Sequence, residues 1–133
     1  MPAKTRFLNP ETLSRPPAYS QVVEVTTPGR MVFISGQIGV RADGKLVEGD
    51  FRAQAIQTFE NLKTALAAVG AGFEHVVKLN NYLIELEHQA ILRDVRGLYL
   101  NMAAPPASTS VRVVGFAREG ALLEVEAIAV LPE

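Results

Sequence analysis

Between residues 51 and 69, apolar side chains recur at three- and four-residue steps, the spacing that places them on one face of an α-helix. Asp50 is suited to cap the start of this segment, and Gly70 and Gly72 follow its end, as glycines commonly do after helices. The pattern therefore predicts an amphipathic helix whose inner face carries Phe51, Ala55, Phe59, Leu62, Leu66 and Val69.

A second helix is predicted over residues 87–102, with an inner stripe of Ile91, Val95, Leu98 and Met102 and a stop at Pro105-Pro106. Short β-prone runs predict strands at residues 22–25, 31–35, 76–86, 110–116 and 122–131. We expect the first two strands to form one hairpin and the last two another. Residues 1–17, rich in proline, are expected to form an extended arm. The predicted fold is one α+β domain spanning residues 1–133.

The last predicted strand is apolar on both of its faces. Leu123, Val125, Ala127 and Ala129 alternate with Ile128 and Val130, so the two sets point to opposite sides of a sheet. Two helices cover only one face of such a sheet. We therefore expect the other face to be covered by a second copy of the chain.

Composition narrows the function classes. The chain has 133 residues, 48% hydrophobic and 20% charged, with a net charge of −1 and no cysteine. These values are typical of a globular protein, and the lack of a basic run argues against a nucleic-acid partner. No residues form a secretory signal or membrane span, which favours a cytoplasmic location without a membrane partner. The spacing of His75 and His88 indicates no metal site.

Glu124 and Glu126 share one face of the last predicted strand and are candidates for general acid or base chemistry. Their alternative role is as solvated or ion-paired side chains at a rim. Ser35 and Gly36 end an apolar strand, where exposed backbone N–H groups suit an anion or a carbonyl oxygen, or form an ordinary turn. Tyr19 and the hydroxyls of Ser108, Thr109 and Ser110 either line a cleft or serve packing and turns.

Four segments together, in this order along the chain, resemble the Rid family, that is, the YjgF/RidA-like proteins. They are Phe33-Ile34-Ser35-Gly36-Gln37-Ile38, the helix with Gln54-Ala55 and Phe59-Glu60-Asn61-Leu62-Lys63, Pro106-Ala107-Ser108-Thr109-Ser110-Val111, and Leu123-Glu124-Val125-Glu126-Ala127-Ile128-Ala129. The resemblance runs from about Tyr19 to Leu131. It implies a chorismate-mutase-like α+β fold and a homotrimer with a central β-barrel and small-molecule clefts between subunits.

The resemblance also implies hydrolysis of enamine and imine metabolites, with no cofactor and no metal. It gives Glu124 a role in positioning or activating water, and it makes Tyr19, Ser35 and Gly36 substrate-binding residues. Ser108 stands where the family has an arginine that binds a substrate carboxylate, and a serine cannot replace that charged fork. We therefore expect weak or absent activity on 2-aminoacrylate.

Arg93 or Arg96 is a candidate replacement for the missing guanidinium, although base rates favour a surface position for both. Two other function classes stay open: a metabolite-binding or regulatory protein without turnover, and an endoribonuclease, a label that such relatives often carry. The endoribonuclease reading has the weaker support, since the chain lacks basic–aromatic surface patterning and a suitably placed histidine pair.

Overall fold

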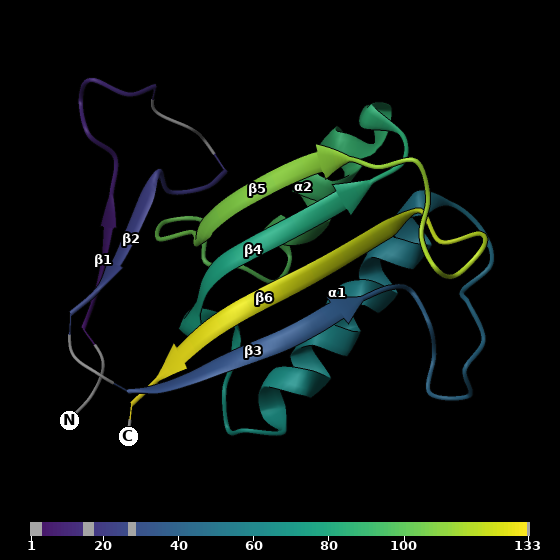
Figure 1. The fold of residues 1–133 in the computed structure, drawn as a ribbon, viewed down its shortest axis with the longest axis horizontal. Coiled ribbons are helices and arrows are strands. Elements are labelled where there is room, and N and C mark those ends of the chain that lie inside the picture. The colour runs from purple at the N-terminus through teal and green to yellow at the C-terminus, as the bar shows by residue number, and fades with distance from the viewer. Residues whose placement is uncertain (1–3, 15–17, 27–28, 133) are drawn as a thin grey trace.

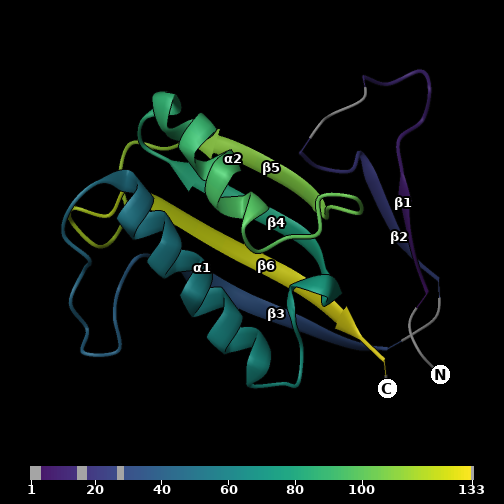
Figure 2. The ribbon, with the colours of Figure 1, turned by 180° about the vertical axis from the view of Figure 1, so that it is seen from behind.

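The computed structural model describes residues 4–14, 18–26 and 29–132. Its main sheet has the strand order β3 (Arg30–Gln37), β6 (Leu123–Leu131), β4 (Val76–Leu83) and β5 (Ala107–Arg112). Strand β6 is antiparallel to both of its neighbours, whereas β4 and β5 are parallel. The helices α1 (Phe51–Ala67) and α2 (Gln89–Gly97) lie side by side on one face of this sheet (Figures 1 and 2). The predicted α+β class is thus confirmed.

Helix α1 forms where the apolar spacing predicts it. The Asp50 carboxylate accepts a hydrogen bond from the backbone N–H of Ala53 at 3.0 Å, which satisfies one of the free donors of the first turn. Phe59, Leu62 and Leu66 are fully buried against the sheet. The helix ends at Ala67, two residues before the predicted end, and Gly70 follows with a positive φ of 77°.

Helix α2 is shorter than predicted, and some of the residues that it buries differ from those predicted. A turn of 3-10 helix at Leu86–His88 precedes it, and the α-helix ends at Gly97. Leu98, predicted to face inward, follows the last helical residue and is 70% exposed, whereas Leu92, Val95 and Arg96 are buried. Residues three and four apart share a face only within a continuous α-helix. The spacing therefore does not apply to residues before Gln89 or after Gly97.

Both predicted hairpins are wrong. Strand β2 (Val22–Val25) pairs with β1 (Thr5–Leu8), which forms inside the predicted N-terminal arm, and β3 pairs with β6. Strand β5 pairs with β4 and not with β6. The connection over residues 113–122 is long enough for β6 to take the central place, where an apolar strand gains two neighbours.

The alternation predicted for β6 is confirmed. Leu123, Val125 and Ala129 are fully buried toward the helices, and Ala127 is 3% exposed. The opposite face of the sheet, which we call the open face, has no helix over it among the residues that the structure describes (Figure 1). Among the described residues, no helix is long and apolar enough to cross a membrane.

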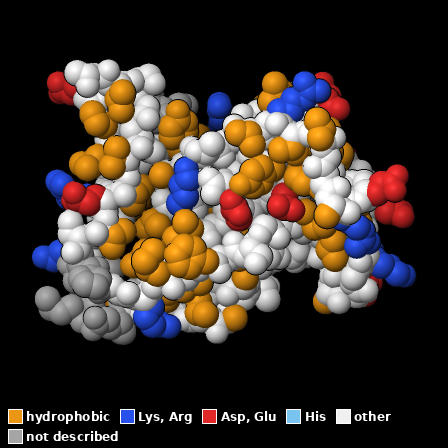
Figure 3. Space-filling model, viewed as in Figure 1, with side chains coloured by type: hydrophobic (Ala, Val, Ile, Leu, Met, Phe, Trp, Pro, Cys, Tyr) orange, Lys and Arg blue, Asp and Glu red, His pale blue; other side chains and the backbone are white. Residues whose placement is uncertain are grey.

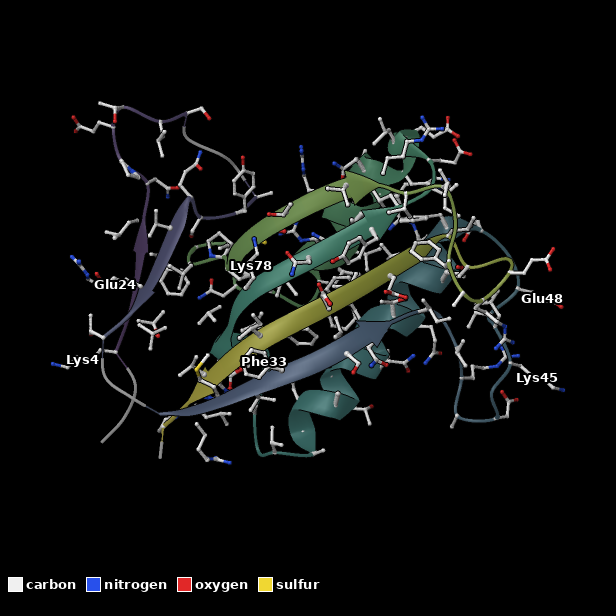
Figure 4. The ribbon with its side chains drawn as sticks, viewed as in Figure 1. Lys4, Glu24, Phe33, Lys45, Glu48 and Lys78 are labelled. Atoms are coloured by element: carbon white, nitrogen blue, oxygen red, sulfur yellow. The ribbon has the colours of Figure 1, made fainter. Side chains whose placement is uncertain are left out.

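The open face carries large apolar side chains. Phe33 is 70% exposed and Met31 is 62% exposed, both on β3. Hydrophobic side chains gather around the start of β3 and the end of β6 (Figure 3), and Figure 4 shows Phe33 lying over the sheet on this side. Apolar exposure of this kind marks an interaction surface more often than a solvated one.

Candidate functional site

A bulge in β3 brings Gly36 against Glu124. The register between β3 and β6 shifts between Ile34 and Gln37, so one residue of the pair Ser35–Gly36 has no partner across the ladder. A Cβ atom built on Gly36 would lie 2.5 Å from Oε2 of Glu124. The glycine is therefore required for the Glu124 carboxylate to lie over the β3 backbone. Glu124 is half-buried at this position.

Ser35 lines a cavity of about 260 Å³ on the open face together with Phe33, Ile34, Asn80, Glu126, Ala127 and Ile128. The carboxylate in this cavity is that of Glu126, which accepts hydrogen bonds from the Tyr82 hydroxyl at 2.7 Å and from the Asn80 amide at 3.1 Å. Both bonds use Oε1 of Glu126. The hydrogen bond to Glu126 raises the pKa of Tyr82, with smaller contributions from burial and from the charges of Glu126 and Glu124.

Tyr19 and Ser108 line a second cavity, of about 220 Å³, at the edge strand β5. Ser20 holds the segment that contains Tyr19 next to the residues before β5. Its N–H donates to the Pro106 carbonyl at 3.2 Å, and its hydroxyl donates to the Pro105 carbonyl at 2.6 Å. The remaining lining residues are Ala18, Gln89, Arg93, Arg96 and Ser110.

Asn81 holds the serines of this second cavity. It is fully buried, and its Nδ2 lies 2.9 Å from Oγ of Ser108, 3.2 Å from Oγ of Ser110 and 3.0 Å from the carbonyl oxygen of Thr109. A carbonyl oxygen only accepts hydrogen bonds, so the contact with Thr109 fixes which end of the amide is the donor. The two serine hydroxyls thus accept from Asn81 and keep their own hydrogens for other partners.

The expectation of a surface position is wrong for Arg96. Its side chain is buried, with 6% exposure for the residue, and its Nη2 donates to the Ala18 carbonyl at 3.0 Å. Its buried Nε has no hydrogen-bond partner among the described residues. Burial, and to a lesser degree the nearby charge of Arg93, lowers the pKa of Arg96. Arg93 is exposed, as expected, but it lines the same cavity.

The predicted site residues thus fall into two groups on one chain. Ser35, Gly36 and Glu124 lie at the β3 bulge beside β6, and Tyr19 and Ser108 lie at the edge strand β5. No described residue lines both cavities. Sequence reasoning did not single out Asn81 and Tyr82, because their roles depend on which strands pair.

The two histidines contact different neighbours in the structure. Over the described part of the chain, no three His, Asp or Glu side chains gather closely enough to hold a metal ion. His75 precedes β4 and its Nδ1 accepts a hydrogen bond from the Gly72 N–H, while His88 precedes α2 and stacks on Phe51. The two histidines therefore do not act as a pair.

The sequence and fold match known proteins over most of their length. Residues 12–131 match the family described as Endoribonuclease L-PSP. Protein DfrA of Myxococcus xanthus is 44% identical over 84% of each chain, and a 2-iminobutanoate/2-iminopropanoate deaminase of Dermatophagoides farinae is 34% identical over 85% of each. The crystal structure of the Rid-family protein YyfB from Yersinia pestis superposes with a TM-score of 0.88 at 35% identity, covering 96% of this chain and 98% of that one. The chain therefore belongs to the Endoribonuclease L-PSP family, the family of the YjgF, RidA and RutC proteins.

Proposed function

We propose that this protein hydrolyses a small imine, or the enamine that tautomerises to it, in clefts formed between the subunits of a homotrimer. The observation that carries the proposal is the division of the site into two groups on one chain. One group, at Gly36 and Glu124, presents a carboxylate and bulged backbone on the open face of the sheet. The other, at Tyr19 and Ser108, presents hydrogen-bonding side chains at the edge of the sheet.

Association through the open face brings the two groups together. Phe33 and Met31 leave large apolar areas exposed there, and burial of such surface is the main driving force of protein association. The edge strand β5 of one subunit then lies where it faces the β3 bulge of the next. Each cleft of the trimer receives the Glu124 group from one subunit and the Tyr19 group from its neighbour.

The reaction needs water at the carbon of a C=N bond. Glu124 accepts a proton from a bound water as the water oxygen bonds to that carbon, and passes the proton to the nitrogen, which gives a tetrahedral carbinolamine. The carbinolamine hydroxyl then gives its proton to the nitrogen through Glu124, and cleavage of the C–N bond releases ammonia and leaves a carbonyl product. Backbone N–H groups freed by the bulge at Ser35 and Gly36 are suited to hold the polar end of the substrate.

The relative from Dermatophagoides farinae, named as a 2-iminobutanoate/2-iminopropanoate deaminase, supports this reaction class. The family description names an endoribonuclease instead. That activity fits this chain less well. The two histidines contact different neighbours and do not form a pair for acid–base cleavage, and a net charge of −1 does not favour RNA binding.

Ammonia release from imines generated in situ by an amino-acid oxidase tests the proposal. We expect turnover that Glu124→Gln lowers by about 10²-fold or more, the range for loss of a general base. Glu126→Gln is the matched control, since it removes the neighbouring carboxylate, and we expect a smaller effect. Binding of the carbonyl product without any ammonia release would instead indicate a binding protein, and an effect confined to Glu126→Gln would move the base to that residue.

A further inference from the structure

A cavity of about 490 Å³ lies at the end of the molecule opposite strands β1 and β2, and the proposed function does not use it (Figure 1). Its walls are the loop over residues 41–49, the first turn of α1 at Gln54 and the loop before β6 at Gly120. Figure 4 shows Lys45 and Glu48 on the first of these loops. The cavity shares no lining residue with the cavities at β3 and β5, so it is a separate site.

Hydrogen bonds within the chain fix the two loops. The Arg41 N–H donates to the Lys45 carbonyl at 2.9 Å, and the Gly44 N–H donates to the Arg41 carbonyl at 2.9 Å, which closes a tight turn. Nη2 of Arg118 donates to the Gly44 carbonyl at 3.1 Å. This last bond joins the loop before β6 to the turn, so the side chains of Arg41, Lys45 and Arg118 are held around one cavity.

Gln54 joins helix α1 to the loop before β6. The residue is 3% exposed, and its amide donates to the Gly120 carbonyl at 3.0 Å and accepts from the Leu122 N–H at 2.9 Å. Both ends of the amide are therefore used within the chain. Binding of a ligand then depends on the charged side chains of the walls.

Cations predominate among these side chains. Arg41, Lys45 and Arg118 line the cavity, and Glu48 supplies the only carboxylate among the described residues that line it. Asp43 lies 4.0 Å from Nε of Arg41, and exposed pairs at this distance contribute little. Three cations from two loops, opposed by one carboxylate, favour a ligand with more than one negative charge.

We infer that this cavity binds a phosphate group, free or carried by a small metabolite, through Arg41, Lys45 and Arg118. A phosphate group presents several strong acceptor oxygens, which guanidinium groups bind with paired N–H donors and an ammonium binds as a point charge. Arg118 uses one donor on the Gly44 carbonyl, which positions its guanidinium and leaves other donors for the ligand. The volume falls within the range of roughly 300–1,000 Å³ typical of small-molecule sites, which favours a phosphate ester.

Calorimetric titration of the full-length protein tests the inference, with ribose 5-phosphate, ribose and inorganic phosphate as probes. We expect saturable binding of ribose 5-phosphate and at least about tenfold weaker binding of ribose, because only the ester is charged. Tighter binding of the ester than of inorganic phosphate would identify an ester as the ligand, and equal or weaker binding would identify the free ion. Equal binding of ribose 5-phosphate and ribose would overturn the inference, and so would the absence of saturable binding by both phosphate compounds.

Variants locate the site. We expect Lys45→Gln and Arg118→Gln each to weaken ribose 5-phosphate binding by about two- to fivefold, the range for charge pairs between exposed groups. Glu48→Gln should tighten binding, because it removes the carboxylate that repels the ligand. Arg30→Gln is the matched control for Arg118→Gln. Arg30 is also exposed and also donates to one carbonyl, that of Val69, but it does not line the cavity.

Arg93→Gln distinguishes this cavity from the one at β5, which Arg93 lines. The inference requires that this variant bind ribose 5-phosphate as tightly as the wild-type protein does. Weaker binding by Arg93→Gln, with unchanged affinity in Lys45→Gln and Arg118→Gln, would move the phosphate to the other cavity and contradict the inference. If Arg118→Gln does not fold without its bond to Gly44, as judged by circular dichroism, Lys45→Gln still decides.

Discussion

Gly36 and Glu124 are packed so closely that a single methyl group does not fit between them. A β-carbon on Gly36 would approach Oε2 of Glu124 to 2.5 Å and the carboxylate carbon to 2.7 Å. The contact comes from the bulge in β3, which turns the backbone of Ser35 and Gly36 out of the regular ladder. The position of the proposed water-activating carboxylate is therefore set by the absence of a side chain on the neighbouring strand.

Gly36→Ala is expected to displace the Glu124 carboxylate and to lower turnover severely, by about 10²-fold if the base is misplaced by an ångström. The fold should survive, because the added methyl group meets the far end of a side chain and not the backbone. Steady-state kinetics and thermal unfolding measure the two effects. Gly115→Ala is the control, since a β-carbon there meets no atom within 4 Å. A fully active Gly36→Ala protein would contradict the assigned role of Glu124.

Asn81→Ala is expected to lower the free energy of unfolding by about 1–3 kcal/mol, the usual cost of leaving buried hydrogen-bonding groups without partners. The variant removes the donor shared by Ser108, Ser110 and the Thr109 carbonyl. Urea unfolding measures the change. Asn101→Ala, at an exposed position, should change stability much less. Equal stability losses in the two variants would contradict the role given to Asn81.

Tyr99 should make the stability depend on alkaline pH. Burial, together with a hydrogen bond to Glu60, raises the pKa of Tyr99 to about 12, whereas an unfolded tyrosine titrates near pH 10. The folded state therefore holds this proton more tightly. The stabilisation is complete below about pH 10 and is lost as the pH rises from about 10 to about 12.

Unfolding in urea measured along this pH range, for the wild-type protein and Tyr99→Phe, checks the expectation. As the pH rises, the unfolding free energy of the wild-type protein should fall relative to that of the variant, because phenylalanine has no proton to lose. A difference that does not change with pH would show that the Tyr99 pKa is not raised.

Phe33→Glu is expected to prevent assembly of the proposed trimer, because it places a charge in the apolar part of the open face, where Phe33 is 70% exposed in the single chain. Sedimentation equilibrium should show a trimer for the wild-type protein and smaller species for the variant, with ammonia release lost in parallel. Leu98→Glu is a matched control, because Leu98 is also 70% exposed but follows α2 on the other side of the sheet. A trimeric Phe33→Glu protein would contradict the assignment of this surface.

Local sequence patterns predicted the helices and strands better than they predicted which strands pair. Helix α1 has an uninterrupted apolar stripe and a capping aspartate, and β6 has a strict alternation, so both were predictable from neighbouring residues. The pairings of β2 with β1 and of β5 with β4 join segments that are distant in the sequence. The glycines at positions 29 and 120 of the sequence are compatible with hairpin turns, but β6 is instead buried between β3 and β4.

The candidate site shows the same division. The sequence indicated Gly36 and Glu124 individually, yet their contact depends on the bulge and on the pairing of β3 with β6. Arg96 has the residue type of a surface position, yet it is buried and donates a hydrogen bond to the Ala18 carbonyl, which is distant in the sequence. Asn81 became visible as a positioning residue once β5 was placed beside β4.

Mixing two inactive variants tests most directly whether each cleft is shared between subunits. One chain carries Glu124→Gln and the other Ser108→Leu, whose larger side chain blocks the cavity at β5. After the chains are unfolded and refolded together in equal amounts, about a quarter of the clefts should combine an intact Glu124 with an intact Ser108 from the adjacent subunit. The account predicts ammonia release near a quarter of the wild-type rate. A mixture as inactive as its two components would contradict it, because both groups would then have to come from the same chain.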